Sequence, residues 1–152
     1  MAQATKIDLS GQVALVTGGT RGLGRAIAAS LAEAGCRVVV CARNAPESLP
    51  EGVAFIPGDI RDPDAARAMI EAIVAEHGRI DILINNAGGS PATAIEAASP
   101  RFVDAILKLN LIAPLYLAQA AHPHMVRQGG GSIVNIASGS GIRPPPGTAV
   151  YG

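Results

Sequence analysis

The sequence is poor in aromatic residues and carries no surplus of either charge. Aromatic residues make up 3% of its 152 residues, and 12 Lys and Arg balance 12 Asp and Glu. Proteins that bind nucleic acids neutralise phosphates with clustered basic residues and stack bases on aromatic rings. This composition offers neither feature, so we expect no nucleic-acid partner.

Cysteine is also scarce. The two cysteines, Cys36 and Cys41, are too few for a disulfide framework, and their spacing fits no zinc site. His122 and His124 stand two residues apart, so on a helix they would not share a face. We therefore predict no metal site, and the low cysteine content fits a reducing compartment. Cys41 falls in a predicted buried strand, where an inert apolar role is expected.

Long apolar runs are missing as well. No apolar run approaches the roughly 20 residues of a membrane-spanning helix, and the polar start MAQATK lacks the apolar core of a signal peptide. These absences predict a cytoplasmic protein with no membrane partner. The chain is 49% hydrophobic and only 16% charged, against about 25% charged residues in typical soluble proteins. Such a chain folds rather than remaining disordered, and its length suits a single domain.

Apolar segments of strand length alternate with segments of helical periodicity. The expected strands are residues 12–17, 37–42, 53–57, 80–84 and 132–137. The expected helices are residues 25–34, residues 63–77, and a long helix from residue 100 to the glycines at 129–131. Aspartate or serine followed by proline marks the start of the last two, and Pro114 is expected to interrupt the long one. This alternation predicts an α/β protein with a parallel sheet and a ligand site at the carboxyl ends of its strands.

A glycine-rich turn joins the first strand to the first helix. The segment TGGTRGLG, residues 17–24, places Gly18, Gly22 and Gly24 in a G-x-x-x-G-x-G pattern. Glycines there let the backbone turn sharply and approach a pyrophosphate, which the helix N-terminus would stabilise. Because the spacing differs from the G-x-G-x-x-G fingerprint, a tight turn without a ligand is the alternative.

Further motifs follow in the chain. They are the NNAG segment at residues 85–88 after the fourth strand, Asn110 in the long helix, and Ser138 upstream of Tyr151. Together with the TGxxxGxG turn, their order and spacing resemble the short-chain dehydrogenase/reductase family. The resemblance covers residues 9–152, and chains of that family continue beyond the position of Gly152. It implies a nicotinamide-dependent oxidoreductase that acts on a small-molecule carbonyl compound or secondary alcohol.

The resemblance also implies a doubly wound parallel sheet of Rossmann type. This chain would carry the N-terminal five strands of that sheet, in the order 3-2-1-4-5. Residues 1–152 would form one dinucleotide-binding domain that lacks the C-terminal part of the family domain. The implied cofactor-binding residues are Gly18, Thr20, Arg21, Gly22, Leu23, Gly24, Arg43, Asp59, Ile60, Asn86, Ala87 and Gly88.

The end of the second strand indicates which nicotinamide cofactor is preferred. It carries Arg43, with no acidic residue before Glu47. An arginine pairs with the 2′-phosphate of NADP, whereas a carboxylate accepts hydrogen bonds from the 2′-hydroxyl of NAD. With Arg21 as a second cation, we predict NADP, with NAD as the second choice; the alternative for Arg43 is a solvated surface charge. Asp59 matches the adenine-contacting acid of the family, and its alternative role is that of a turn residue.

The resemblance assigns catalytic roles to three residues. Tyr151 would donate a proton to the substrate carbonyl oxygen, Ser138 would hydrogen-bond that oxygen, and Asn110 would hold a water in the proton relay. Asn110 has the alternative role of a hydrogen-bonding residue at the helix interruption. The ordinary pKa of tyrosine is about 10, so a nearby cation is needed for it to act near neutrality. The family places a lysine four residues after the tyrosine, which here would lie beyond Gly152.

Without that lysine, the 152-residue chain is expected to be nearly inactive and poorly soluble. Two function classes therefore stay open: an oxidoreductase whose sequence continues, and a non-catalytic dinucleotide-binding fragment or inactive subunit.

The resemblance further implies a homo-oligomer, because related proteins pair through the helix around residues 102–121 and the helix after the tyrosine. Apolar residues on several faces of that first helix fit an interface, and burial within one monomer explains them equally well.

Overall fold

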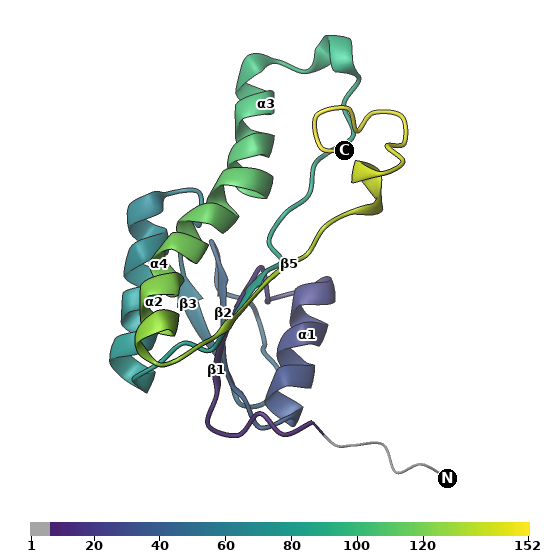
Figure 1. Ribbon diagram of the computed structural model, residues 1–152. Coiled ribbons are helices and arrows are strands. Elements are labelled where there is room, and N and C mark those ends of the chain that lie inside the picture. Colours follow the sequence, from purple (N-terminus) through teal and green to yellow (C-terminus); the bar gives the residue numbers. More distant parts are fainter. Residues whose placement is uncertain (1–6) are drawn as a thin grey trace.

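The computed structural model describes residues 7–152, which form a parallel sheet with helices on both faces (Figure 1). Residues 1–6, on which the signal-peptide expectation rests, lie outside the described residues. The strands are β1 (Val13–Thr17), β2 (Arg37–Ala42), β3 (Val53–Pro57), β4 (Ile82–Asn85) and β5 (Ser132–Asn135). The helices are α1 (Gly22–Glu33), α2 (Pro63–His77), α3 (Pro100–Leu107) and α4 (Ala113–Arg127). Shorter turns are η1 (Ile95–Ala97), the π-helical η2 (Lys108–Ile112) and η3 (Gly139–Gly141).

The strands lie in the order β3-β2-β1-β4-β5 and are all parallel, which confirms the predicted sheet. β1 is central, and every one of its residues is buried because helices cover it from both sides. The register aligns Thr17 with Cys41 and Asn85 with Asn135. The carboxyl ends of the strands therefore lie along one edge of the sheet, where the glycine turn and the NNAG segment follow them.

Separate apolar cores fill the two sides of the sheet. On one side α1 packs through Ala28 near Val16 and Val40 of the strands. On the other side α2 and α4 bury Ile70 and Leu117. Full burial of one large aliphatic side chain contributes roughly 1.5–3 kcal/mol. These cores hold the strand ends in fixed positions.

The helix starts follow the predicted capping residues. Asp62 accepts a hydrogen bond from the Asp64 N–H at 2.9 Å, and Ser99 accepts one from the Phe102 N–H at 3.2 Å. Each cap is followed by a proline at the first helical position, as predicted. α1 begins at Gly22, earlier than the predicted residue 25, because the glycine turn leads directly into the helix.

The expectation that Pro114 interrupts the long helix is confirmed in part: the helical path runs over Pro100–Arg127, but the regular α-helix gives way to a π-helical turn between α3 and α4. In a regular α-helix, a proline ring collides with the carbonyl four residues earlier, here that of Asn110. The preceding turn η2 is instead π-helical, and this wider turn accommodates the ring. Asn110 Nδ2 also donates to the Ile106 carbonyl at 2.9 Å, which stabilises the widened turn.

The same helix corrects the expectation about apolar runs. By length and composition alone, this helix of 28 residues is long and apolar enough to cross a membrane. The polar residues Lys108 and Asn110 divide the run in the sequence and hide this property. In the fold, the helix buries Ala113, Leu117 and Ala121 in the core that it shares with α2.

Asp81 ties the start of β4 to its surroundings. Its carboxylate accepts hydrogen bonds from the buried Val13 N–H at 2.9 Å and from Arg79 Nε at 2.8 Å. Burial alone would raise the pKa of Asp81, but these hydrogen bonds and the charge of Arg79 outweigh burial and hold the pKa below its ordinary value of 3.8. The ionised carboxylate therefore stabilises the fold above that ordinary value, and this contribution is lost as the pH falls through the lower folded-state pKa.

We predict that Asp81→Ala lowers the free energy of unfolding at neutral pH by about 1–3 kcal/mol, because the buried Val13 N–H loses its acceptor. Urea denaturation measures this loss, which should shrink as the pH is lowered toward about 3. Asp64→Ala is the matched control, since it removes an exposed pair with Arg67 and should change stability by less than about 0.5 kcal/mol. Equal losses in the two variants would contradict the role of Asp81.

Candidate functional site

A cleft of about 580 Å³ opens along the carboxyl ends of β1, β2, β3 and β4. Its volume lies within the range of small-molecule sites, about 300–1,000 Å³. All the residues that the sequence predicts to bind a cofactor line this one cleft: Gly18, Thr20, Arg21, Gly22, Leu23, Gly24, Arg43, Asp59, Ile60, Asn86, Ala87 and Gly88. The fold thus gathers segments from four strand ends around one space.

The glycine turn forms one wall of the cleft. Gly18 and Gly22 have φ angles of +64° and +53°, which residues with a side chain rarely adopt. At Gly24 a Cβ would lie 2.4 Å from Asn86 Nδ2 and 2.5 Å from the Gly18 carbonyl oxygen, so a side chain has no room there. At Gly22 a Cβ would meet no atom within 4 Å and would enter the open cleft.

The N-terminus of α1 borders the same cleft. Arg21, its N-cap residue, makes no side-chain hydrogen bond to the helix, and the first turn contains no acidic residue. The first N–H groups of a helix lack partners within the helix, and the helix dipole adds positive potential there. This end of α1 is therefore suited to bind an anion such as a pyrophosphate.

Thr17 joins the glycine turn to the NNAG segment. Its buried hydroxyl accepts hydrogen bonds from the Asn86 and Ala87 N–H groups at 3.0 and 2.9 Å, and it donates to the Ile84 carbonyl at 3.3 Å. Asn86 Nδ2 in turn donates to the Thr17 carbonyl at 2.9 Å. These contacts fix the two loops relative to each other.

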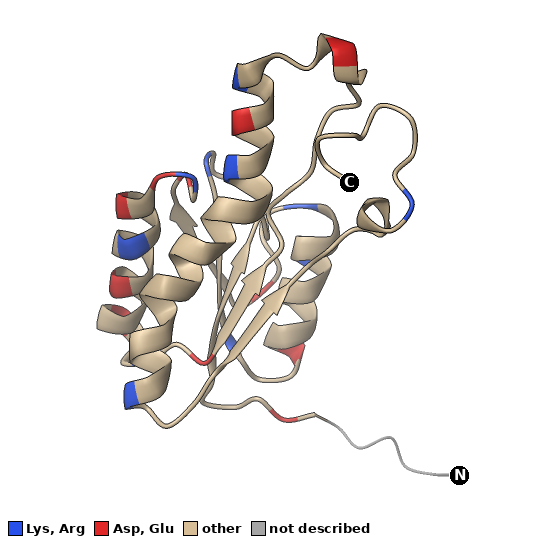
Figure 2. Cartoon of the chain, turned by 45° about the horizontal axis from the view of Figure 1, so that its top comes forward, with Lys and Arg blue, Asp and Glu red and all other residues tan. Residues whose placement is uncertain are grey.

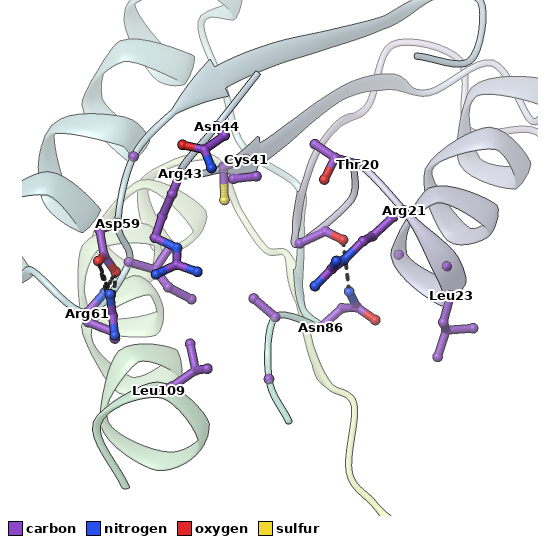
Figure 3. Close-up of a pocket in the computed structure, with 18 residues that line it drawn as sticks. Thr20, Arg21, Leu23, Cys41, Arg43, Asn44, Asp59, Arg61, Asn86 and Leu109 are labelled. Carbon is purple, nitrogen blue, oxygen red and sulfur yellow. Dashed lines mark hydrogen bonds and ion pairs between the residues drawn. The ribbon is translucent and has the colours of Figure 1, made fainter. Parts of the chain in front are cut away.

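The opposite end of the cleft is charged (Figure 3). Asp59 and Arg61 form an ion pair in which Arg61 Nε lies 2.8 Å from Asp59 Oδ1. The hydrogen bond from the Arg61 side chain, with smaller help from the charge of Arg43, holds the pKa of Asp59 below its ordinary value of 3.8 despite partial burial. Asp59 is consequently ionised at neutral pH.

Two other arginines of the cleft, Arg21 and Arg43, form no ion pair with any residue in the described range 7–152. In Figure 3, Arg43 lies between the Asp59–Arg61 pair and the open part of the cleft, while Arg21 extends from the glycine turn. Unpaired guanidinium groups in a cleft favour an anionic ligand, because they form charge-assisted and often bidentate hydrogen bonds with phosphate.

Cys41 lines the cleft but is only 1% exposed. Burial raises the pKa of its thiol to about 12, so the group remains protonated near neutral pH and is not a nucleophile. Burial likewise raises the pKa of Cys36 to about 11. Within residues 7–152, no group of three or more His, Cys, Asp and Glu residues is arranged to hold a metal ion.

A second cavity of about 480 Å³ adjoins the first and shares the segment 86–88 with it. Asn110 and Tyr151 both line this second cavity. Ser138 is not among its lining residues. Its hydroxyl accepts a hydrogen bond from the Ser140 N–H at 3.1 Å and caps η3. The structure therefore brings together two of the three predicted catalytic residues and leaves Ser138 outside.

Asn110 connects the long helix to the segment that follows NNAG. Its Oδ1 accepts a hydrogen bond from the Gly89 N–H at 2.7 Å, and its Nδ2 donates to the Gly89 carbonyl at 3.1 Å. A Cβ at Gly88 would lie 2.7 Å from Asn110 Oδ1, so the two segments approach too closely there for a larger residue. Together with its bond to Ile106 inside the helix, these contacts hold the Asn110 side chain at the cavity wall.

The set predicted to bind a cofactor lacks six residues that line the first cleft: Cys41, Ala42, Asn44, Gly58, Arg61 and Leu109. Arg61 lies two residues after the predicted acid Asp59, and that spacing is the signal that could have identified it. Leu109 enters the cleft from the π-helical turn η2, and no signal in the sequence predicts that turn. Thr17, which belongs to the glycine motif, acts as the link between loops rather than as a lining residue.

Comparisons with known proteins agree with this arrangement. The sequence model of the family described as short chain dehydrogenase matches residues 12–152. A Caenorhabditis elegans protein named dehydrogenase/reductase SDR family member 4 is 37% identical over 93% of this chain and 59% of its own length. The 2-dehydro-3-deoxy-D-gluconate 5-dehydrogenase of Escherichia coli is 39% identical over 93% of this chain and 61% of its own length.

A solved structure shares the fold as well. The crystal structure of a short-chain dehydrogenase from Streptomyces avermitilis has a TM-score of 0.85 and 33% identity, covering 92% of this chain and 54% of that protein. The chain therefore belongs to the short-chain dehydrogenase family. It spans 59% and 61% of the two curated relatives just described. Membership of the family implies a nicotinamide cofactor, NAD or NADP.

Proposed function

We propose that this chain binds NADP(H) and serves an oxidoreductase that interconverts a small-molecule carbonyl compound and a secondary alcohol. The observation that carries the proposal is the cleft in which a glycine turn, an uncapped helix N-terminus and the unpaired Arg43 border one space. Family membership supports the reaction class, and the cationic lining supports a dinucleotide that carries an additional phosphate.

The residues present fit such a cofactor. Gly22 leaves open space where a pyrophosphate would approach α1, and Arg43 would bind the 2′-phosphate at the end of β2. Asp59 and Ile60 would contact the adenine, the acid as a hydrogen-bond acceptor and the isoleucine as an apolar surface. Asn86 and its neighbours border the passage to the second cavity.

The second cavity would hold the reacting part of the substrate. A bound nicotinamide supplies or accepts the hydride in this chemistry. Tyr151 would donate a proton to the substrate carbonyl oxygen, and Asn110 would orient a water that renews this proton. The Ser138 hydroxyl accepts from the Ser140 N–H, so its own O–H would be the donor to the same substrate oxygen.

Arg43→Ala tests the cofactor preference. We expect the affinity for NADPH to fall by about 10- to 100-fold, the range for loss of a charge-assisted hydrogen bond, while the affinity for NADH stays within about twofold. Fluorescence titration with each reduced cofactor measures both values. Arg37→Ala, at the opposite end of the same strand, is the matched control and should change neither.

A parallel loss of NADPH and NADH affinity in Arg43→Ala would show that this arginine acts on the shape of the cleft rather than on the 2′-phosphate. Equal wild-type affinities for the two cofactors would contradict the proposed preference. Binding of either cofactor without turnover of any carbonyl compound would favour the non-catalytic dinucleotide-binding module.

We further propose that the protein is cytoplasmic and that two copies pair through the long helix. Leu107, Leu111 and Leu115 of this helix are 42%, 56% and 53% exposed and recur at helical spacing. Leu111 and Leu115 also line the second cavity, so the pairing surface would adjoin the substrate site. Figure 2 shows charged residues on α2, whereas α4 is almost free of them. An apolar stripe of this kind is typical of the centre of a protein interface.

A further inference from the structure

Arg43 and Asp59 are neighbours through the register of the sheet. β2 and β3 align Ala42 with Pro57, and the Gly58 N–H continues the pairing by donating to the Ala42 carbonyl at 3.0 Å. Arg43 and Asp59 therefore follow two adjacent strand ends, and both line the cleft. Side chains of opposite charge in such positions would ordinarily form an ion pair.

The Asp59 carboxylate instead forms an ion pair with Arg61. Arg61 Nε donates to both carboxylate oxygens, at 2.8 and 3.1 Å, and the Arg61 backbone N–H donates to Oδ1 at 3.1 Å. Arg61 Nη2 adds a further contact to Oδ2. The pair is a bidentate fork on a two-residue spacing, which leaves Asp59 little freedom to turn toward Arg43.

We propose that Arg61 is a positioning residue that occupies the Asp59 carboxylate and thereby keeps the Arg43 guanidinium available for the phosphate of the ligand. This inference rests on the proposed NADP(H) function and adds to it a residue that determines specificity. Arg61 itself need not touch the phosphate. Its effect passes through Asp59, which in the absence of Arg61 would pair with the nearest remaining cation.

The electrostatics of the cleft support this assignment. The positive charge of Arg43 already contributes to the low pKa of Asp59, after the larger effect of the Arg61 hydrogen bond, so the two groups are close enough to interact. Figure 3 shows Arg43 beside the Asp59–Arg61 pair and facing the open cleft. Removing Arg61 would leave one acid next to one cation, and their pairing would neutralise the charge that a 2′-phosphate needs.

The test measures the ratio of NADPH affinity to NADH affinity by fluorescence titration. NADH is the internal reference, because the two ligands share the adenine, the pyrophosphate and the nicotinamide. We expect Arg61→Gln to lower this ratio by about tenfold, since an Arg–phosphate contact is charge-assisted. Arg67→Gln removes an exposed arginine that pairs with Asp64 on α2, and it should leave the ratio unchanged.

A double variant separates positioning from direct contact. With Asp59→Asn added to Arg61→Gln, no carboxylate remains to capture Arg43, and the ratio should return to within about threefold of the wild-type value. A ratio that stays low in the double variant would show that Arg61 binds the phosphate itself, which overturns the proposal. A high wild-type ratio that Arg61→Gln leaves unchanged overturns this inference alone. A wild-type ratio near one overturns both this inference and the proposed NADP preference.

Discussion

In Gly22→Val, the affinity for a nicotinamide dinucleotide is expected to fall by on the order of 100-fold or more while the protein still folds. The Cβ of a residue at this position would meet no protein atom within 4 Å, so the substitution creates no clash in the fold itself. It places an isopropyl group in the cleft at the N-terminus of α1, where the pyrophosphate would lie. Isothermal titration with NADPH and NADH measures the loss, and circular dichroism reports folding.

The backbone of Gly22 has a φ of +53°, so valine also introduces strain, and a control must reproduce that strain. Gly78→Val does so, because Gly78 ends α2 with a φ of +78° and a Cβ there would likewise meet no atom within 4 Å. We expect similar destabilisation in both variants and loss of binding only in Gly22→Val. Undiminished binding in Gly22→Val would reduce the glycine motif to a tight turn.

For Tyr151→Phe, the rate of carbonyl reduction is expected to fall by about 10²- to 10⁴-fold, the usual contribution of a general acid or base. The substitution removes only the hydroxyl group from the wall of the second cavity. NADPH affinity should stay within about twofold, since Tyr151 does not line the first cleft. The measurement is NADPH oxidation with a panel of carbonyl compounds, on protein expressed from its full open reading frame.

Tyr116→Phe is the matched control for this experiment. Tyr116, the other tyrosine of the chain, belongs to α4. It packs against the apolar core between the sheet and the helices α2 and α4, and it lines neither cavity. Its hydroxyl should be dispensable for turnover. If Tyr151→Phe reduced carbonyl compounds as fast as the wild type, the proton donor would have to be sought elsewhere in the chain.

Much of the fold could be predicted because a parallel sheet covered on both sides leaves a strong pattern in the sequence. VALVT of β1 and RVVVCA of β2 are nearly continuous apolar runs, and the glycines and capped prolines mark where helices begin. The long helix was predicted less well. Pro114 breaks a regular α-helix, and only the folded chain shows that a π-helical turn accommodates it.

The candidate site shows a similar division. Backbone motifs such as the glycine turn could be placed in the cleft because their position at a strand end follows from the strand pattern. The partners of side chains could not be predicted. Asp59 has two arginines nearby, Arg43 and Arg61, and only the structure shows that Arg61 is the one that forms the ion pair with it. The orientation of Ser138 toward Ser140 was equally inaccessible, because it depends on local turn geometry.

The buried hydroxyl of Thr17 has a consequence for the thermodynamics of ligand binding. The side-chain oxygen of Thr17, the last residue of β1, bonds three backbone groups of β4 and the segment after it, those of Ile84, Asn86 and Ala87, without contact with solvent. Two loops joined in this way have already given up their conformational entropy when the chain folds. A dinucleotide entering between them does not have to supply the free energy for ordering them, so more of its contact energy remains as affinity.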